Sequence, residues 1–312
     1  MSKVFITGGA GYIGTALIPK LLSEGHQVTV FDMLLHGGNQ LVPFFRNRNF
    51  NFIRGDIRNF ESLKKAVEGH DIVIHLAAIV GFPACRMNPE MAKDVNVQGT
   101  INLIEACSPD QPILYGSTGS NYGVVTDICT EETPLNPLSL YGETKTEAEL
   151  LLMERGNVVA YRFATAFGAS PRMRLDLLVN DFSHKCLKDG YLVVYEKHFM
   201  RTFIHVSDIA DSFVFAINNL PTMIDNVYNV GADHMNFSKE DVCKMIAAKT
   251  NAFIHFEDIG EDADKRNYIV SYDKINSLGF KALVSMEEGV DEILSVLKIM
   301  DFEDNYTNAR FF

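Results

Sequence analysis

The chain has 312 residues, of which 47% are hydrophobic, and its formal net charge at pH 7 is −12. This content is enough for a substantial core in one large domain or two modest ones. The negative charge argues against sequence-independent binding to nucleic acid or to an anionic membrane, because both need a positive surface.

A strand, a glycine turn and a helix open the chain. The apolar residues 4–6 lead into Thr7-Gly8-Gly9-Ala10-Gly11-Tyr12-Ile13-Gly14, which is followed by an amphipathic segment ending near Glu24. Gly8 permits a tight turn, Gly11 lets the backbone approach a pyrophosphate, and Gly14 lets the helix pack closely on the strand. The N–H groups at the start of this helix would bind the phosphates.

A second strand, residues 27–31, ends at Asp32, where a dinucleotide site places an acidic residue on the ribose 2′-hydroxyl. Each feature alone would fit an ordinary turn or strand end, but their order predicts a dinucleotide-binding unit. Residues 33–35 contain no Arg or Lys that could bind a 2′-phosphate. The predicted cofactor is therefore NAD rather than NADP.

Strands and helices keep alternating. A third strand, 50–54, runs toward Asp56 and Ile57, and Asp56 either faces the adenine or caps the strand end. Residues 71–78 form a buried parallel strand that runs into the small residues Ala77 and Ala78 beside Leu76, which leaves room for a cofactor.

Helices at 60–67 and 89–106 and strands at 112–116 and 158–162 continue this pattern. The alternation predicts an α/β Rossmann fold with a doubly wound parallel sheet. The pattern changes after residue 163.

We predict a NAD-binding domain at 1–170 and a smaller, mixed α/β substrate-binding domain at 171–312, of which 201–230 returns to the first domain. Two capping boxes, Ser238 to Asp241 and Ser285 to Glu288, mark the starts of later helices.

Tyr141 and Lys145 lie four residues apart at the start of a predicted helix, so they share one face. A nearby ammonium favours the phenolate of a tyrosine, whose ordinary pKa is about 10, and Tyr141 could then act as a base on a sugar or alcohol hydroxyl. Such a pair is often a solvated surface pair. Its place after residues 117–123, at the carboxyl end of the fifth strand, favours an active site.

With these motifs the sequence resembles the extended short-chain dehydrogenase/reductase family, specifically its nucleotide-sugar epimerase/dehydratase branch. The resemblance covers nearly the whole chain and also includes His75-Leu76-Ala77-Ala78 and residues 201–208. It implies that Thr118 hydrogen-bonds the reacting hydroxyl and Tyr141 takes its proton. It also implies that Lys145 holds the nicotinamide ribose and lowers the pKa of the tyrosine, while hydride passes from sugar C4 to NAD.

The resemblance assigns the other site residues as well. The residues expected at the cofactor are Gly8, Gly11, Tyr12, Ile13, Gly14, Asp32, Asp56, Ile57, Leu76, Ala77, Ala78, Tyr141 and Lys145. Those expected at a nucleotide-diphosphate sugar are Ser117, Ser120, Arg172, Arg174, Asn180, Arg201 and Arg266. Arg201 and Arg266 would clamp the diphosphate with paired guanidinium donors, although either could instead form an exposed ion pair.

Two positions separate the activities within this family. The 4,6-dehydratases typically carry Asp-Glu directly after the catalytic Thr, where Gly119 and Ser120 stand here, and the sugar-acid decarboxylases usually have Glu in place of Ser120. We therefore expect a 4-epimerase or 4-dehydrogenase. Residues 170–182 resemble a subgroup from bacterial surface-polysaccharide pathways that includes enzymes oxidising GDP-heptose at C4.

Three alternatives remain: a 4,6-dehydratase, a non-catalytic NAD-sensing regulatory protein, and a ketone reductase acting on a small substrate. The sensor predicts a damaged catalytic triad, whereas Thr118, Tyr141 and Lys145 are all present. The ketone reductase would leave Arg201 and Arg266 without a diphosphate.

The expected assembly is a homodimer, because members of this family commonly pair through the helices corresponding to 89–106 and 138–153. Neither a disulfide framework nor a metal site is expected, because the five cysteines form no close pairs and no Cys/His ligand spacing. The N-terminus has no charged-then-apolar leader, and no apolar run approaches the roughly 18 residues of a membrane span. We expect an unprocessed cytoplasmic protein.

Overall fold

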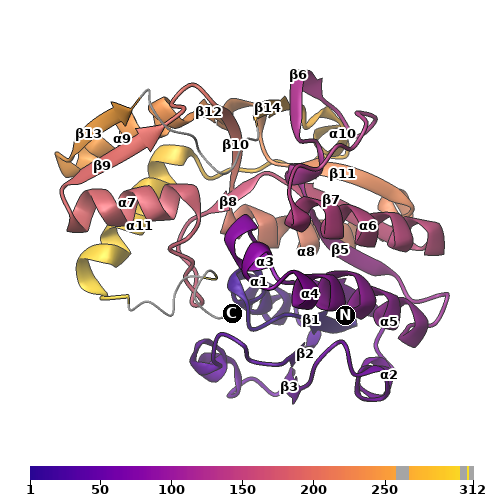
Figure 1. The fold of residues 1–312 in the computed structure, drawn as a ribbon. Helices are drawn as coiled ribbons and strands as arrows, with labels where there is room; N and C mark the ends of the chain where they lie inside the picture. The colour runs from indigo at the N-terminus through magenta and orange to yellow at the C-terminus, as the bar shows by residue number, and fades with distance from the viewer. Residues whose placement is uncertain (258–266, 303–307, 309–312) are drawn as a thin grey trace.

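A seven-stranded parallel sheet forms the larger part of the molecule in the computed structural model, which describes residues 1–257, 267–302 and 308 (Figure 1). Its strand order is β11-β7-β5-β4-β1-β2-β3. The strands are β1 (Lys3–Thr7), β2 (Gln27–Asp32), β3 (Phe50–Arg54), β4 (Ile72–His75), β5 (Ile113–Thr118), β7 (Val158–Phe163) and β11 (Asn226–Val230). This arrangement confirms the predicted doubly wound α/β fold.

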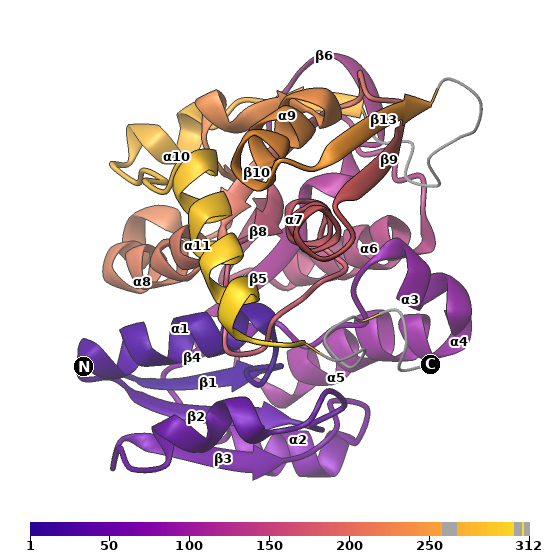
Figure 2. The ribbon, with the colours of Figure 1, turned by 90° about the vertical axis from the view of Figure 1, so that its left-hand side faces the viewer.

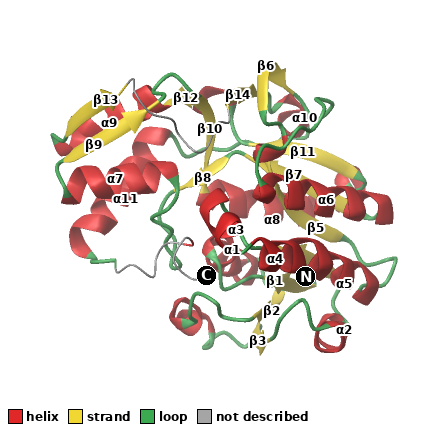
Figure 3. Cartoon of the chain, viewed as in Figure 1, coloured by secondary structure: helices red, strands yellow, loops and turns green. Residues whose placement is uncertain are grey.

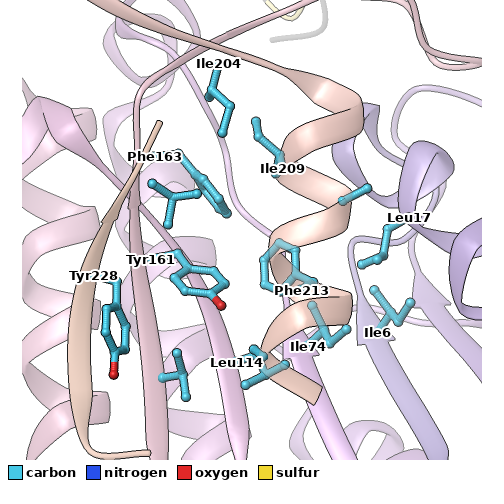
Figure 4. Packing of buried hydrophobic residues seen from close by; sticks show 14 of the residues in the cluster. Ile6, Leu17, Ile74, Leu114, Tyr161, Phe163, Ile204, Ile209, Phe213 and Tyr228 are labelled. Carbon is cyan, nitrogen blue, oxygen red and sulfur yellow. The ribbon is translucent and has the colours of Figure 1, made fainter. Parts of the chain in front are cut away.

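Helices cover both faces of this sheet because its strands are apolar on both sides, and every residue of β4 and β7 is buried. One face packs on α1 (Tyr12–Ser23) and α8 (Val206–Met223), and the other on α2 (Phe60–Val67), α5 (Gly99–Ala106) and α6 (Leu140–Arg155). Figure 4 shows the first face, where Leu17 and Phe213 meet side chains from the strands.

The long helix expected at 89–106 contains a π-helical turn. It consists of α4 (Pro89–Lys93), the turn η2 (Asp94–Gln98) and α5. Asn96 in this turn is buried, and its amide both accepts from the Ile79 N–H (2.7 Å) and donates to the Ile79 carbonyl (3.0 Å). The local widening of the helix thus accompanies a side chain that binds the main chain after β4.

The smaller part of the molecule, which Figure 2 shows beside the large sheet, has its own apolar core. Both predicted capping boxes are confirmed, at the starts of α9 and α11. The elements of this part are α7 (Leu178–Lys188), β9 (Tyr191–Tyr195), η4 (Asp233–Met235), β12 (Asn236–Ser238), α9 (Lys239–Thr250), β13 (Phe253–Glu257) and α11 (Met286–Ile299). The short helix α10 (Asp273–Ser277) packs instead on β11 and contributes Ile275 to the core of the large sheet.

Several segments connect the two parts. The small sheet β12-β10-β8 contains β8 (Thr165–Phe167) and β10 (Met200–His205), after which the chain returns to the large sheet through α8 and β11. In addition, β6 (Val124–Cys129) pairs with β14 (Asn267–Val270). Short helical segments lie at η1 (Asn39–Phe44), α3 (Phe82–Met87) and η3 (Gly119–Asn121), and Figure 3 shows the loops that join the elements. Among the described residues, no helix is long and apolar enough to span a membrane.

Candidate active site

A cavity of about 740 Å³ lies at the carboxyl ends of the large sheet's strands, facing the smaller part of the molecule. The chain order of the sheet reverses between β1 and β4, which is where open α/β sheets bind ligands. The cavity is lined by the glycine turn, the ends of the strands, the start of α6 and the segment 172–178. A volume in this range suits a small-molecule ligand.

The glycine turn leaves room that side chains would fill. Gly8 has φ +72°, and a Cβ there would lie 2.5 Å from the Ala77 nitrogen. A Cβ at Gly14 would lie 2.4 Å from the Gly9 carbonyl oxygen. Gly11 is the N-cap of α1 and forms no side-chain cap, so the first N–H groups of this helix can serve a ligand. These residues fit a dinucleotide diphosphate.

Asp32, at the end of β2, lines the cavity and also holds the glycine turn. Its carboxylate accepts hydrogen bonds from the N–H groups of Ala10 (3.0 Å) and Leu34 (2.7 Å). Burial raises the pKa of this carboxyl group, and the two hydrogen bonds oppose that effect. The side chain therefore has a structural role as well as a position suited to a ribose.

Asp56 lines the cavity and caps the end of β3 at the same time. It accepts from the Arg58 N–H at 2.9 Å and pairs with the Arg58 guanidinium, with Nη2 2.5 Å from Oδ2. Asp56 thus caps the end of the strand, and its place in the cavity also fits the predicted contact with the adenine. The other predicted cofactor residues also line the cavity: Tyr12, Ile13, Ile57, Leu76, Ala77 and Ala78.

The structure brings Thr118, Tyr141 and Lys145 to one wall of the cavity. Thr118 ends β5, and its hydroxyl accepts from the Ser120 N–H (3.1 Å) and donates to the Ser120 hydroxyl (3.0 Å). Tyr141 and Lys145 lie one turn apart on α6. This helix begins after Ser139, whose hydroxyl accepts from the Gly142 N–H (3.2 Å).

Lys145 is almost fully buried, with 3% of its surface exposed. Its ammonium lies 4.0 Å from the centre of the Tyr115 ring. Burial lowers the pKa of Lys145 to about 7, although the carboxylate of Glu149 acts in the opposite direction. A lysine with this pKa changes charge near neutral pH.

Three of the predicted arginines also line the cavity: Arg172, Arg174 and Arg201. Arg174 pairs with Asp176 through two bonds, Nη2–Oδ2 at 2.5 Å and Nε–Oδ1 at 3.2 Å. Arg201 is 1% exposed and donates to the Met200 carbonyl at 3.0 Å. Arg266 lies outside the described residues.

Ser117 and Asn180, both predicted to bind substrate, instead form hydrogen bonds to other groups of the protein. Ser117 borders the cavity, but its hydroxyl donates to Glu149 Oε2 at 2.5 Å. Asn180 does not line the cavity; its amide donates to the carbonyls of Gly168 (3.2 Å) and Arg174 (2.9 Å). Asn180 therefore supports the segment that carries the arginines. Ser120 lines the cavity as expected.

The cavity also contains side chains that were not assigned from the sequence. His36 lines it, and burial lowers the pKa of this imidazole to about 3, with Arg172 and Arg174 acting in the same direction. Asn308 lines it as well and accepts from Arg172 Nη2 at 2.9 Å. No local pattern marks an asparagine near the C-terminus as part of this site. Asp176 lies close to the predicted arginines in the sequence, but the sequence assigned no role to it in the site.

A Rossmann sheet with a glycine turn, and a threonine, tyrosine and lysine at the carboxyl ends of its strands, define a dehydrogenase/reductase of the short-chain class. The chain belongs to the NAD dependent epimerase/dehydratase family, whose model matches residues 4–231. The predicted family and the NAD-dependent enzyme class are thereby confirmed.

The similarity to known proteins extends over almost the whole chain. A putative UDP-glucose 4-epimerase of Methanocaldococcus jannaschii is 26% identical, covering 95% of this chain and 98% of the relative. UDP-glucuronic acid decarboxylase 1 of Arabidopsis thaliana is 30% identical, covering 98% of this chain and 71% of the relative. The structure of UDP-glucuronic acid 4-epimerase from Bacillus cereus with UDP-glucuronic acid and NAD is similar with a TM-score of 0.85 at 26% identity, covering 95% of this chain and 99% of that one. These relatives differ in reaction, so similarity alone selects no single activity.

Proposed function

We propose that the protein is a nucleotide-sugar 4-epimerase or 4-dehydrogenase that acts by oxidation at sugar C4. The observation that carries this proposal is the shared cavity, which Thr118, Tyr141 and Lys145 line together with the glycine turn and with Arg172, Arg174 and Arg201. Guanidinium groups suit a diphosphate, and the triad suits a secondary alcohol.

In this mechanism Thr118 orients the C4 hydroxyl by hydrogen bonding, and Tyr141 accepts its proton. The ammonium of Lys145, one helical turn away, favours the phenolate form of the tyrosine. Bound NAD supplies the acceptor for the C4 hydride, so that loss of one C–H and one O–H bond leaves a C4 ketone. In an epimerase the ketone takes the hydride back on its other face while Tyr141 returns the proton, whereas a dehydrogenase releases the ketone and NADH.

The acidic side chains of the cavity support a reaction without loss of water. Among the described residues, the cavity is lined by Asp32, Asp56 and Asp176, and the first two lie at the ends of β2 and β3, on the cofactor side. Burial raises the pKa of Asp176, but its pairing with Arg174 outweighs this and lowers the pKa below its usual value. Asp176 is thus a carboxylate and a poor proton donor. Asp127 of β6 and Glu143 of α6, two acidic residues near the triad in sequence, do not line the cavity.

We propose GDP-heptose as the first substrate to test, with a role in surface-polysaccharide sugar biosynthesis in the cytoplasm. The resemblance of residues 170–182 to the GDP-heptose-oxidising subgroup supports this choice, and Arg172 and Arg174 of that segment reach the cavity. Mass spectrometry of an extract from denatured protein would reveal a copurified nucleotide or nucleotide sugar. Thermal-shift titrations with GDP-, UDP- and dTDP-sugars would rank the bases.

The reaction is tested by incubating the enzyme with its nucleotide sugar in deuterated water and following products by NMR and mass spectrometry. We expect a 4-keto sugar or a C4 epimer of unchanged carbon skeleton. A product lighter by one water, with deuterium at C5, would establish the 4,6-dehydratase instead. Binding of NAD without turnover of any sugar would favour the sensor, while turnover of small ketones alone would favour the reductase.

A further inference from the structure

Glu149 of α6 is a buried carboxylate on the same helix face as Tyr141 and Lys145. Tyr141, Lys145 and Glu149 follow each other at intervals of four residues and therefore occupy successive turns of one face. Only the first two line the cavity. Glu149 is 1% exposed, so it faces the protein interior and has no contact with solvent that would explain its charge.

Glu149 joins α6 to the strand that carries Thr118. Its Oε2 accepts from the hydroxyl of Ser117, the residue directly before Thr118, at 2.5 Å. The same oxygen accepts from the side-chain amide of Asn121, just after Thr118, at 3.2 Å. The helix that holds the tyrosine and lysine is thus tied to both sides of the threonine.

Arg162 of β7 holds the carboxylate from the other side. Its Nη2 lies 2.6 Å and its Nε 3.0 Å from Glu149 Oε1. Arg162 Nη1 donates to the Tyr122 hydroxyl (3.1 Å) and the Glu131 carbonyl (3.0 Å). Apolar residues of similar size are often as stabilising as a buried ion pair, so stability alone gives a weak reason for this pair.

We propose that Glu149 is a positioning residue for the C4 oxidation: through Ser117 and Asn121 it sets the position of α6 relative to the end of β5, and its charge faces Lys145. The inference rests on the proposed roles of Thr118, Tyr141 and Lys145. These three side chains come from two elements, and a shift of about 1 Å between reacting groups can cost a hundredfold in rate.

The charge of Glu149 also acts on Lys145. The titratable groups that surround Lys145 are Tyr141 and Glu149 of α6, Tyr115 of β5, His75 of β4 and Cys85 of α3. Burial lowers the pKa of Lys145 to about 7, and Glu149 is the largest effect in the opposite direction. Lys145 is cationic below its pKa, so removing the carboxylate should move its loss of charge to lower pH.

The test compares Glu149→Gln with a double variant, Glu149→Gln/Arg162→Met, which removes both buried charges and so avoids leaving the arginine unpaired. Glu147→Gln, an exposed acid on the same helix, is the matched control. For each holoenzyme, kcat, KM, melting temperature and the pH profile of kcat/KM are measured with the nucleotide sugar. Both Glu149 variants should lose about 10- to 100-fold in kcat with little change in KM. In the pH profile of kcat/KM, the decrease at high pH that follows the loss of charge on Lys145 should begin at a lower pH.

A purely structural role predicts a different pattern. If the double variant regains both the melting temperature and the turnover and pH profile of the parent, the proposal is wrong. If Glu149→Gln alone does not fold, the double variant still decides the question. Glu149→Asp keeps the charge, so its kcat/KM should fall at the same high pH as that of the parent.

NADH titrations over a range of pH need no sugar and separate this inference from the proposed function. Because Lys145 is expected to bind the cofactor as a cation, NADH affinity should fall with rising pH. This fall should occur at a lower pH in Glu149→Gln and in Glu149→Gln/Arg162→Met than in the parent. Identical pH dependence in parent and variants would overturn the inference. Absence of turnover with every sugar would instead overturn the proposed function, but the NADH titration would still test the role of Glu149 because it needs no sugar.

Discussion

Tyr141 is the residue on which the proposed chemistry depends most directly. Replacing it with Phe removes the phenol that accepts the proton while keeping the ring that packs at the start of α6. We expect turnover to fall by about 10²- to 10⁴-fold, the usual contribution of a general base, with NAD binding nearly unchanged. Single-turnover reduction of bound NAD by the nucleotide sugar measures this, and near-native turnover would exclude Tyr141 as the base.

Asp32 is expected to select NAD over NADP, because its carboxylate would repel a 2′-phosphate. Binding titrations should therefore show much weaker binding of NADP than of NAD by the parent enzyme. Asp32→Asn should narrow this difference. It should also lower the melting temperature, because Ala10 and Leu34 donate to different oxygens of the carboxylate and Asn replaces one of these oxygens with an NH2 group. Equal affinity of the parent enzyme for both cofactors would contradict the assignment.

At the level of elements, β1, the glycine turn and α1 form a unit whose close packing depends on Gly14. The methyl group of Gly14→Ala would lie 2.4 Å from the Gly9 carbonyl oxygen and 2.5 Å from its Cα, so the main chain of the turn would have to move. We expect loss of NAD binding and of stability, measured by calorimetric titration and thermal melting. Gly38→Ala is the control, because the atoms nearest to its methyl would belong to the flexible side chain of Leu34, at 3.2 Å and beyond. Normal NAD affinity in Gly14→Ala would show that the turn tolerates this displacement.

For the whole molecule, we predict a homodimer formed through α4, α5 and α6. Leu150 of α6 is 59% exposed, which fits a surface that a second subunit covers. Leu150→Glu should shift the equilibrium toward the 34.9 kDa monomer, whereas Leu283→Glu, at a residue 78% exposed before α11, should not. Sedimentation at micromolar concentration checks both variants. A parent protein that is only monomeric would contradict the prediction.

The cavity itself is a property of the whole molecule. The glycine turn and the ends of the large sheet's strands line it, together with Arg172 and Arg174 from the segment before α7 and Arg201 from β10. Neither the large sheet nor these segments alone have the complete set of groups that the proposed reaction uses. A change that alters how the two parts pack would therefore affect catalysis without touching the triad.

The sequence by itself was sufficient for the alternating strands and helices from β1 to β5 and for strand β7, the glycine turn, the capping boxes at Ser238 and Ser285, and the pairing of Tyr141 with Lys145 on one helix. These features depend on residues within a turn or two of each other, so local patterns determine them. The π-helical turn around Asn96 was missed because it accompanies a contact with Ile79, 17 residues away.

Only the tertiary structure decided how the polar side chains are shared between the cavity and the protein interior. Ser117 donates to Glu149, 32 residues away, and Arg172 reaches Asn308, 136 residues away. Asn180 was assigned to the substrate from a motif, yet its amide binds the main chain of the neighbouring loop. A buried polar group must find a partner wherever packing places one, and that choice is set by the arrangement of whole elements rather than by spacing along the chain.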